Sequence, residues 1–240
     1  MRRILTIALL FVPANSAALA QQPCQVQIGR PIHTYSIVAR DPDTGQLGVA
    51  VQSHWYSVGP IVPWAEAGVG AVATQSIVEV SYGPLGLDLM RAGKSAPDAL
   101  KALLTADPQG EYRQVAMVDA QGRVAAHTGK LCILEAGHKV GPQYSCQANL
   151  MLKNTVWDAM SRAFESARGD LTDRLLAALE VAEREGGDIR GRQSAAIIVV
   201  SGKATGRPWE DRIFDLRVED HPNPVEELKR LVRLKRAYDH

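Results

Sequence analysis

Thr34 is the residue of this sequence with the clearest capacity for chemistry. It stands near the start of the stretch "HTYSIVAR", residues 33–40, whose apolar centre predicts a buried strand. A threonine in this position is either an ordinary β-branched strand residue or a nucleophile that acts once it becomes the first residue of the chain. The second interpretation requires cleavage of the peptide bond between His33 and Thr34.

Other polar side chains stand at the ends of neighbouring predicted strands. Ser53, His54 and Gln75 follow the second and third strands, where loops could border a site at the head of the first. We therefore consider them candidates for substrate binding, together with Gln193, which enters a late strand. The alternatives are a surface or packing role for His54, beside which nothing completes a catalytic triad, and a polar strand end for Gln193.

The composition excludes several functions. Aromatic residues make up only 5% of the chain, and the formal charge is +1, which argues against nucleic acid as a partner. The sequence predicts no metal site, because three of its histidines are scattered without the spacing that ligands on one helix face require: His127, His138 and His221. No cofactor is expected.

The first 20 residues have the three parts of a secretory signal peptide. A basic start precedes an apolar run over 4–12, which is too short to span a bilayer, and small residues end at Ala20. Cleavage there would leave residues 21–33 as a tail or propeptide and 34–240 as a single domain. We expect a periplasmic or secreted protein that does not associate with the membrane once the signal is removed.

Three cysteines remain after the signal peptide. Cys132 and Cys146 could form a disulfide in an oxidising compartment, which would leave Cys24 unpaired in the tail. The alternative is two buried thiols. The spacing of the three fits no zinc pattern.

The elements that would position these residues are grouped by type. Three apolar strands come first, followed by two helices, two strands, two more helices, two strands and a final amphipathic helix. The predicted ranges are 33–40, 47–51, 68–75, 82–93, 95–106, 112–119, 123–129, 154–168, 172–185, 194–201, 213–218 and a helix from Pro224. This order is not the strict alternation of a parallel α/β fold. It predicts an α+β fold with sheets between helical layers.

Six stretches of the chain are distinctive: "TYSIVARDPDTGQLGVAVQS", "VPWAEAGVGAVATQS", "YGPLGLDLM", "GRVAAHTG", "YSCQANL" and "GGDIRGRQSAAIIVV". Together they resemble a bacterial family that is catalogued as a domain of unknown function within the N-terminal nucleophile (Ntn) hydrolase superfamily. The likeness covers about 34–238. It implies a four-layer αββα sandwich, and the family has no settled substrate.

A looser likeness is to the proteasome β-subunits of the same superfamily. These begin with a nucleophilic threonine on their first strand and carry an acidic residue late on the second, a position that falls at Gln52 here. The lysine that lowers the pKa of their amine would fall near Glu66. Both departures argue against peptidase chemistry of the proteasome type.

The resemblance implies roles for Thr34, Asn149 and Asp188, and the chemistry of the guanidinium group suggests one for Arg190. Thr34 would attack a carbonyl with its own α-amine as general base, which suits an amine whose ordinary pKa is about 7.7–8.0. Asn149 would lie in a loop, "YSCQANL", that supplies oxyanion contacts through uncharged N–H groups; otherwise it is a turn residue. Asp188 would orient the amine or nucleophile and Arg190 would hold a substrate carboxylate, or the two form a salt bridge within a loop.

The leading interpretation is an exported Ntn-type amidohydrolase that cleaves a small amide or peptide-like bond. A second is a non-catalytic periplasmic protein of the same fold that serves binding or assembly. A third is a hydrolase that retains its tail and uses Cys146 as nucleophile. The apolar stripe of the last helix, with Leu228, Leu231 and Val232 on one side, would serve a homo-oligomer or cover the core.

Overall fold

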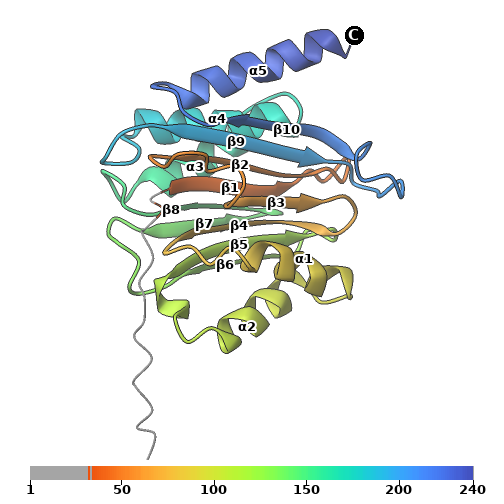
Figure 1. Ribbon diagram of the computed structural model, residues 1–240, viewed down its shortest axis with the longest axis horizontal. Coiled ribbons are helices and arrows are strands. Elements are labelled where there is room, and N and C mark those ends of the chain that lie inside the picture. Colours follow the sequence, from red (N-terminus) through yellow and green to blue (C-terminus); the bar gives the residue numbers. More distant parts are fainter. Residues whose placement is uncertain (1–31, 33, 240) are drawn as a thin grey trace, which may run out of the picture.

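The computed structural model describes residue 32 and residues 34–239 (Figure 1). The predicted signal peptide, residues 1–20, therefore lies outside the described residues. The predicted tail, 21–33, does so as well except for Ile32.

The first of two antiparallel sheets has β1 at its centre. Its six strands lie in the order β10-β9-β2-β1-β8-β7. Their bounds are β1 Thr34–Arg40, β2 Leu47–Ser53, β7 Gly137–Gly141, β8 Tyr144–Ala148, β9 Ser194–Val200 and β10 Arg212–Val218. The predicted hairpin between β1 and β2 is confirmed, and its register places Thr34 opposite Ser53.

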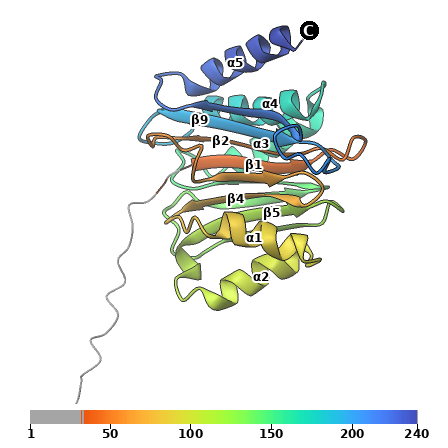
Figure 2. The same ribbon diagram turned by 45° about the vertical axis from the view of Figure 1, so that its right-hand side comes forward.

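The second sheet has four strands in the order β3-β4-β5-β6. Their bounds are β3 Pro63–Glu66, β4 Gly70–Ser76, β5 Arg113–Asp119 and β6 Val124–Thr128. All neighbouring strands are antiparallel. In Figure 2 the two sheets lie face to face along their length.

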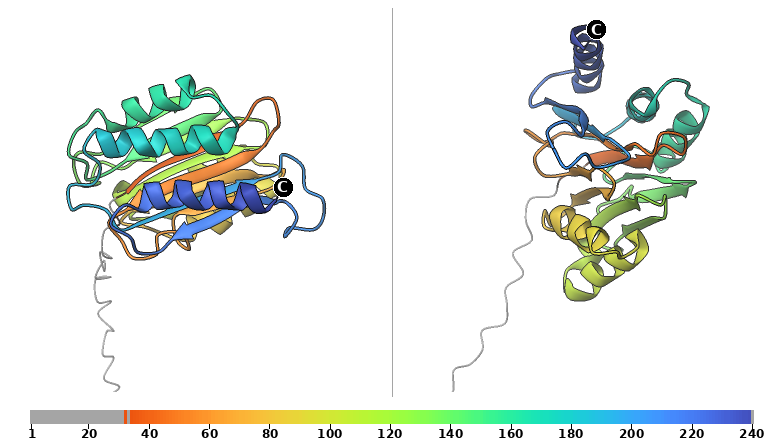
Figure 3. Two further views of the ribbon diagram at one scale, coloured as in Figure 1. Left: turned by 90° about the horizontal axis from the view of Figure 1, so that it is seen from above. Right: turned by 90° about the vertical axis from the view of Figure 1, so that its right-hand side faces the viewer.

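Five helices and one short 3₁₀ turn complete the described elements. Helices α1 (Tyr82–Arg91) and α2 (Ala96–Ala106) contact β4, β5 and β6, and η1 (Gly110–Tyr112) leads into β5. Helices α3 (Val156–Ser166), α4 (Leu171–Arg184) and α5 (Pro224–Tyr238) cover the six-stranded sheet (Figure 3, left). Ser95 caps the N-terminus of α2, because its side chain accepts a hydrogen bond from the Asp98 backbone N–H.

Strand alternation assigns each side chain of β1 to one of two environments. Tyr35, Ile37 and Ala39 belong to an apolar cluster shared with α3, α4 and α5. Val38 points to the opposite face, where it joins a cluster built from both sheets. Thr34 lies on the same face as Val38. Its side chain is therefore directed into the space between the sheets.

The sequence missed β3, β7 and β8. The last of these is a correction, because "YSCQANL" was expected to be a loop and instead contains a fully buried central strand. Its apolar side chains, Tyr144, Cys146 and Ala148, face the helices, whereas Ser145 and Gln147 face the other sheet. The two buried polar residues removed the apolar signature by which a central strand is recognised.

The predicted disulfide is also corrected. Cys132 and Cys146 are both buried free thiols. Cys146 packs under the helices on β8, whereas the Cys132 thiol lies 3.4 Å from the backbone carbonyl oxygen of Arg113 on the other sheet. Cys132, in the loop between β6 and β7, thus contacts the four-stranded sheet, whereas Cys146 lies on the helix-covered face of the six-stranded sheet. Among the residues that the structure describes, no helix is long and apolar enough to cross a membrane.

Candidate functional site

The hydroxyl of Thr34 is fully buried at the head of β1. Its Oγ1 donates a hydrogen bond to the backbone carbonyl oxygen of Ile32 at 3.1 Å and also bonds to Oγ of Ser53 at 3.2 Å. Ser53 is placed there by the hairpin register. The structure therefore brings together the predicted nucleophile and one predicted substrate-binding residue.

The carbonyl oxygen of Thr34 lies at the meeting point of three N–H donors. It accepts hydrogen bonds from the Asn149 backbone N–H at 3.0 Å, from Nε2 of Gln75 at 3.2 Å and from Nδ2 of Asn149 at 3.5 Å. Both side chains are buried. Gln75 is the last residue but one of β4 and Asn149 follows β8, so donors from both sheets fix the main chain of Thr34.

The residues that directly follow these two donors have unusual backbone conformations. Ser76, after Gln75, has φ 73°, and Leu150, after Asn149, has φ 53°. Non-glycine residues adopt this left-handed region uncommonly, and such residues occur often at functional sites. In this chain Ser76 and Leu150 each change the direction of the backbone directly after a residue whose side chain bonds to the carbonyl oxygen of Thr34.

Gln114 on β5 connects the two donors. Its Oε1 accepts a hydrogen bond from Nε2 of Gln75 at 2.7 Å and from Nδ2 of Asn149 at 2.9 Å. Its Nε2 donates to the backbone carbonyls of Ala148 at 2.8 Å and Gly137 at 3.1 Å. Because backbone carbonyls can only accept, they fix the orientation of the Gln114 amide. Gln75 and Asn149 must then present N–H groups to it.

The same network extends along β1 and β8. Ser36 donates to Oε1 of Gln75 at 2.6 Å and accepts from Nε2 of Gln147 at 2.7 Å, and Gln147 accepts from Ser145 at 3.0 Å. The sequence reasoning missed these residues and Gln114. Their signal is the spacing of two residues between polar side chains on otherwise apolar strands, as in Thr34 and Ser36.

Asp188 forms a second cluster next to the first. Its buried carboxylate accepts hydrogen bonds from Nη2 of Arg190 at 2.8 Å and from the backbone N–H of His54 at 3.2 Å. A β-bridge joins Asp188 to Met151, two residues after Asn149. The structure thus realises the loop salt bridge between Asp188 and Arg190. His54 enters this cluster through its backbone, and its buried Nδ1 has no hydrogen-bond partner among the described residues.

Three further residues named in the sequence analysis have side chains that form no hydrogen bond with Thr34 in the described part of the chain. Nε2 of Gln193 donates to Asp220 at 3.1 Å, in the loops before β9 and α5. Glu66 forms an ion pair with Arg91 of α1. It lies beside Gly70, at the start of β4, whereas Gln75 lies near the end of that strand. Gln52 lies opposite Tyr35 and is fully buried, and its side-chain amide has no hydrogen-bond partner in the described part of the chain.

The Cys146 thiol is unsuited to nucleophilic attack. It is fully buried against the helices. Burial raises the pKa of the Cys146 thiol well above its ordinary value, and the carboxylates of Glu165 and Asp158 raise it further. Since the thiolate is the reactive form, this environment disfavours the reaction that a cysteine nucleophile needs.

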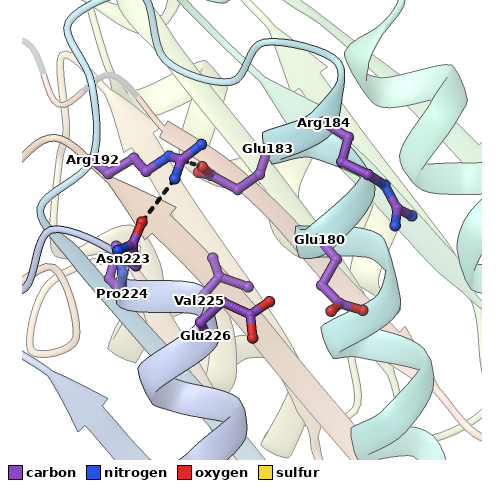
Figure 4. Close-up of a pocket in the computed structure, with 8 residues that line it drawn as sticks. All are labelled: Glu180, Glu183, Arg184, Arg192, Asn223, Pro224, Val225 and Glu226. Carbon is purple, nitrogen blue, oxygen red and sulfur yellow. Dashed lines mark hydrogen bonds and ion pairs between the residues drawn. The ribbon is translucent and has the colours of Figure 1, made fainter.

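A pocket of about 230 Å³ lies between α4 and α5 (Figure 4). It is lined by Glu180, Glu183, Arg184, Arg192, Asn223, Pro224, Val225 and Glu226. Arg192 extends between Glu183, with which it forms an ion pair, and the side-chain oxygen of Asn223. Glu183 also accepts a hydrogen bond from the hydroxyl of Tyr35. None of the predicted site residues lines this pocket.

Burial raises the pKa of Glu183 above its ordinary value, although the Tyr35 hydrogen bond and the Arg192 charge act in the opposite direction. A carboxyl whose pKa is higher in the folded state than in the unfolded state loses stabilising free energy as the pH rises through that window. We therefore expect Glu183→Gln to have a melting temperature at pH 7 equal to or above that of the parent chain. At pH 4, where the parent carboxyl is largely protonated, any excess in melting temperature of the variant over the parent chain should disappear.

Thermal denaturation followed by circular dichroism at both pH values measures the effect. Glu226→Gln serves as the control, because the Glu226 side chain is 66% exposed at the rim of the same pocket. The quantity to compare is the melting temperature of Glu183→Gln minus that of the parent chain. A value of this difference that is lower at pH 7 than at pH 4 would contradict the expectation.

A solved structure is similar to this chain over most of its length. The crystal structure of a protein of the family DUF1028 from Silicibacter pomeroyi is 31% identical, with a TM-score of 0.74, over 84% of this chain and 88% of that chain. Anbu from Hyphomicrobium sp. strain MC1 is 10% identical, with a TM-score of 0.40, over 85% of this chain and 97% of that chain. The latter likeness is too low to bear on the fold.

No curated protein matches this chain. The model of a family described as "Family of unknown function (DUF1028)" matches residues 34–228, most of the sequence. The chain therefore belongs to the family of unknown function DUF1028.

Proposed function

We propose that the chain is an Ntn-type amidohydrolase with a four-layer αββα sandwich, exported by its signal peptide, that cleaves a small amide or peptide-like bond through Thr34. Three separate apolar clusters support the layered arrangement. One lies between the sheets, one under α3, α4 and α5, and one under α1 and α2.

One observation carries the proposed chemistry. Thr34 heads a central strand with its hydroxyl directed between the sheets, next to Ser53, and with Asn149 and Gln75 at its carbonyl. The family match also begins at Thr34. The part of the chain that is shared with the family thus starts at the residue whose amine the chemistry requires.

The proposed reaction begins with hydrolysis of the bond before Thr34, which releases its amine and removes Ile32 as the acceptor of the hydroxyl proton. The free amine, with an ordinary pKa of about 7.7–8.0, then takes the proton from Oγ1. Oγ1 attacks the substrate carbonyl, the amide nitrogen leaves with the proton held by the amine, and an ester to Thr34 remains. Water hydrolyses this ester by the same route and regenerates the hydroxyl.

The oxyanion needs N–H donors as it forms. The Asn149 side chain is the candidate, because its Nδ2 lies near the head of β1 and carries no charge. In the unprocessed chain this amide already bonds to Gln114 and Thr34. We therefore expect a shift of the Thr34 main chain on processing to make the amide available.

A non-catalytic binding protein of the same fold is the second candidate. It is favoured by the side-chain N–H groups of Asn149 and Gln75, which are all directed to protein acceptors in this form. A protein of this kind would keep its tail, bind a ligand and turn over no amide.

The mature N-terminus decides between these functions. The full-length chain is expressed in a Gram-negative host, recovered from the periplasm and studied by intact-mass analysis, in parallel with assays against a library of amides. We expect active protein to begin at Thr34. Active protein that retains residues 21–33 would exclude the amine-base mechanism, and a bound ligand without turnover would support the binding protein.

A further inference from the structure

Ile32 completes the free edge of β4. Strand β3 pairs with β4 only from Gly70 to Ala73, so within the described residues no named strand pairs with the end of β4 on that side. There the backbone N–H of Ser76 donates to the carbonyl oxygen of Ile32 at 3.1 Å, and the N–H of Ile32 donates to the carbonyl oxygen of Ser76 at 2.7 Å. Ile32 thus occupies this edge as a one-residue strand.

The Ile32 side chain is buried together with this backbone pair. It is 1% exposed and belongs to the apolar cluster between the sheets, which also contains Val62 and Ala73. Ser76 is likewise 1% exposed. The position held by Ile32 therefore combines an apolar space with two buried backbone hydrogen-bonding groups. We call this combination the Ile32 site.

Loss of the tail would leave the Ile32 site unsatisfied. Buried backbone N–H and C=O groups require partners, and an emptied apolar space loses its packing contacts. An extended peptide that adds a strand to an exposed sheet edge supplies both, through its main chain and through one side chain. The segment that precedes Thr34 shows which side chain the space accepts, a branched aliphatic one.

We infer that the Ile32 site is a binding site for an extended, peptide-like substrate with a branched aliphatic side chain. The inference rests on the proposed function. Ile32 stands two residues before Thr34, so a substrate in the same register would place this side chain on the residue second from the cleaved amide, on the acyl side. Its main chain would pair with Ser76.

Amide hydrogen exchange of Ser76, measured on protein that retains its tail as confirmed by intact mass, tests the site without any need for catalysis. Ile32→Asp places a charge in an apolar space and should expel the segment, which would raise the exchange rate of the Ser76 N–H at least tenfold. Ile28→Asp, four residues upstream in the same tail, is the matched control and should leave this rate within about twofold. Ile32→Ala, a milder change, should give an intermediate rate and serves if the aspartate variant does not fold.

A synthetic peptide with the sequence of residues 26–33, "VQIGRPIH", is then added to the Ile32→Asp chain. We expect it to restore protection of Ser76, and a peptide with alanine in place of Ile32 to bind at least tenfold more weakly. A peptide with alanine in place of Ile28 should bind like the parent peptide. Unchanged exchange in both Ile32 variants, or no restoration by any peptide, would overturn the inference.

A second readout uses the processed protein. Peptide amides that differ only by isoleucine or alanine at the residue second from the cleaved bond should differ at least tenfold in kcat/KM. Equal values for the two would overturn the substrate preference. Hydrolysis that does not depend on Thr34 would instead overturn the proposed function, and the exchange experiment would still decide the Ile32 site.

Discussion

Replacing Thr34 by alanine is expected to lower kcat/KM for amide hydrolysis by about 10³-fold or more, because it removes the atom on which the acyl intermediate forms. The measurement is hydrolysis of the best amide from the library by parent and variant proteins with confirmed N-termini. Thr34→Ser keeps a hydroxyl in the same place and should retain measurable turnover. The pair therefore separates loss of the nucleophile from loss of the strand residue.

Ser53→Ala provides a matched control for disturbance of the site. It removes the hydroxyl that bonds to Oγ1 of Thr34 but leaves the nucleophile. We expect a loss smaller than that of Thr34→Ala. If Thr34→Ala retains the parent activity while Cys146→Ala loses it, the reaction proceeds through the thiol and the proposed mechanism is wrong.

Replacing Gln114 by leucine is expected to have the largest effect on stability, with a loss of about 4 kcal/mol in the free energy of unfolding. Gln114 is fully buried and bonds to Gln75, Asn149 and two backbone carbonyls. Leucine leaves these groups buried without partners, at a cost of about 1–3 kcal/mol for each group that water cannot reach. Urea denaturation of the two proteins measures the difference.

Gln147→Leu is the comparison for this variant. Gln147 is equally buried and belongs to the same network, but its side-chain partners among the described residues are two serine hydroxyls, those of Ser36 and Ser145. Hydroxyls can rotate towards other acceptors, so we expect a loss of about 1–2 kcal/mol. A loss for Gln114→Leu no larger than that for Gln147→Leu would show that Gln114 does not hold the network together.

The strands around Thr34 were predictable to different degrees. Strands β1, β2 and β9 are buried on both faces, and their continuous apolar runs identify them in the sequence. Because the loop between β1 and β2 is short, it also fixes the hairpin register, and the nearness of Ser53 to Thr34 follows from local information. The two antiparallel sheets and five helices agree with the predicted α+β class.

The contact of Gln75 and Asn149 with the carbonyl oxygen of Thr34 could not be derived from residue patterns. It depends on how the two sheets stack and on the pairing of β1 with β8, which are contacts between residues far apart in the chain. The sequence also does not reveal which groups a buried glutamine bonds to, and the role of Gln114 therefore emerges only from the structure. The position of Gln193 directly before β9 predicts a place at the site, but its side chain extends along the loop to Asp220.

The pairing of β1 with β8 also determines at which stage of folding the contacts around Thr34 form. Asn149 lies 115 residues after Thr34 in the sequence, and contacts of such long range form late and slowly in folding. A chain that cut itself before Thr34 could therefore do so only after the sheet had closed, and the new terminus would appear with a lag. Cleavage by another protease would need no such delay. The time at which the new N-terminus appears, relative to folding, would therefore distinguish self-cleavage from cleavage by another protease.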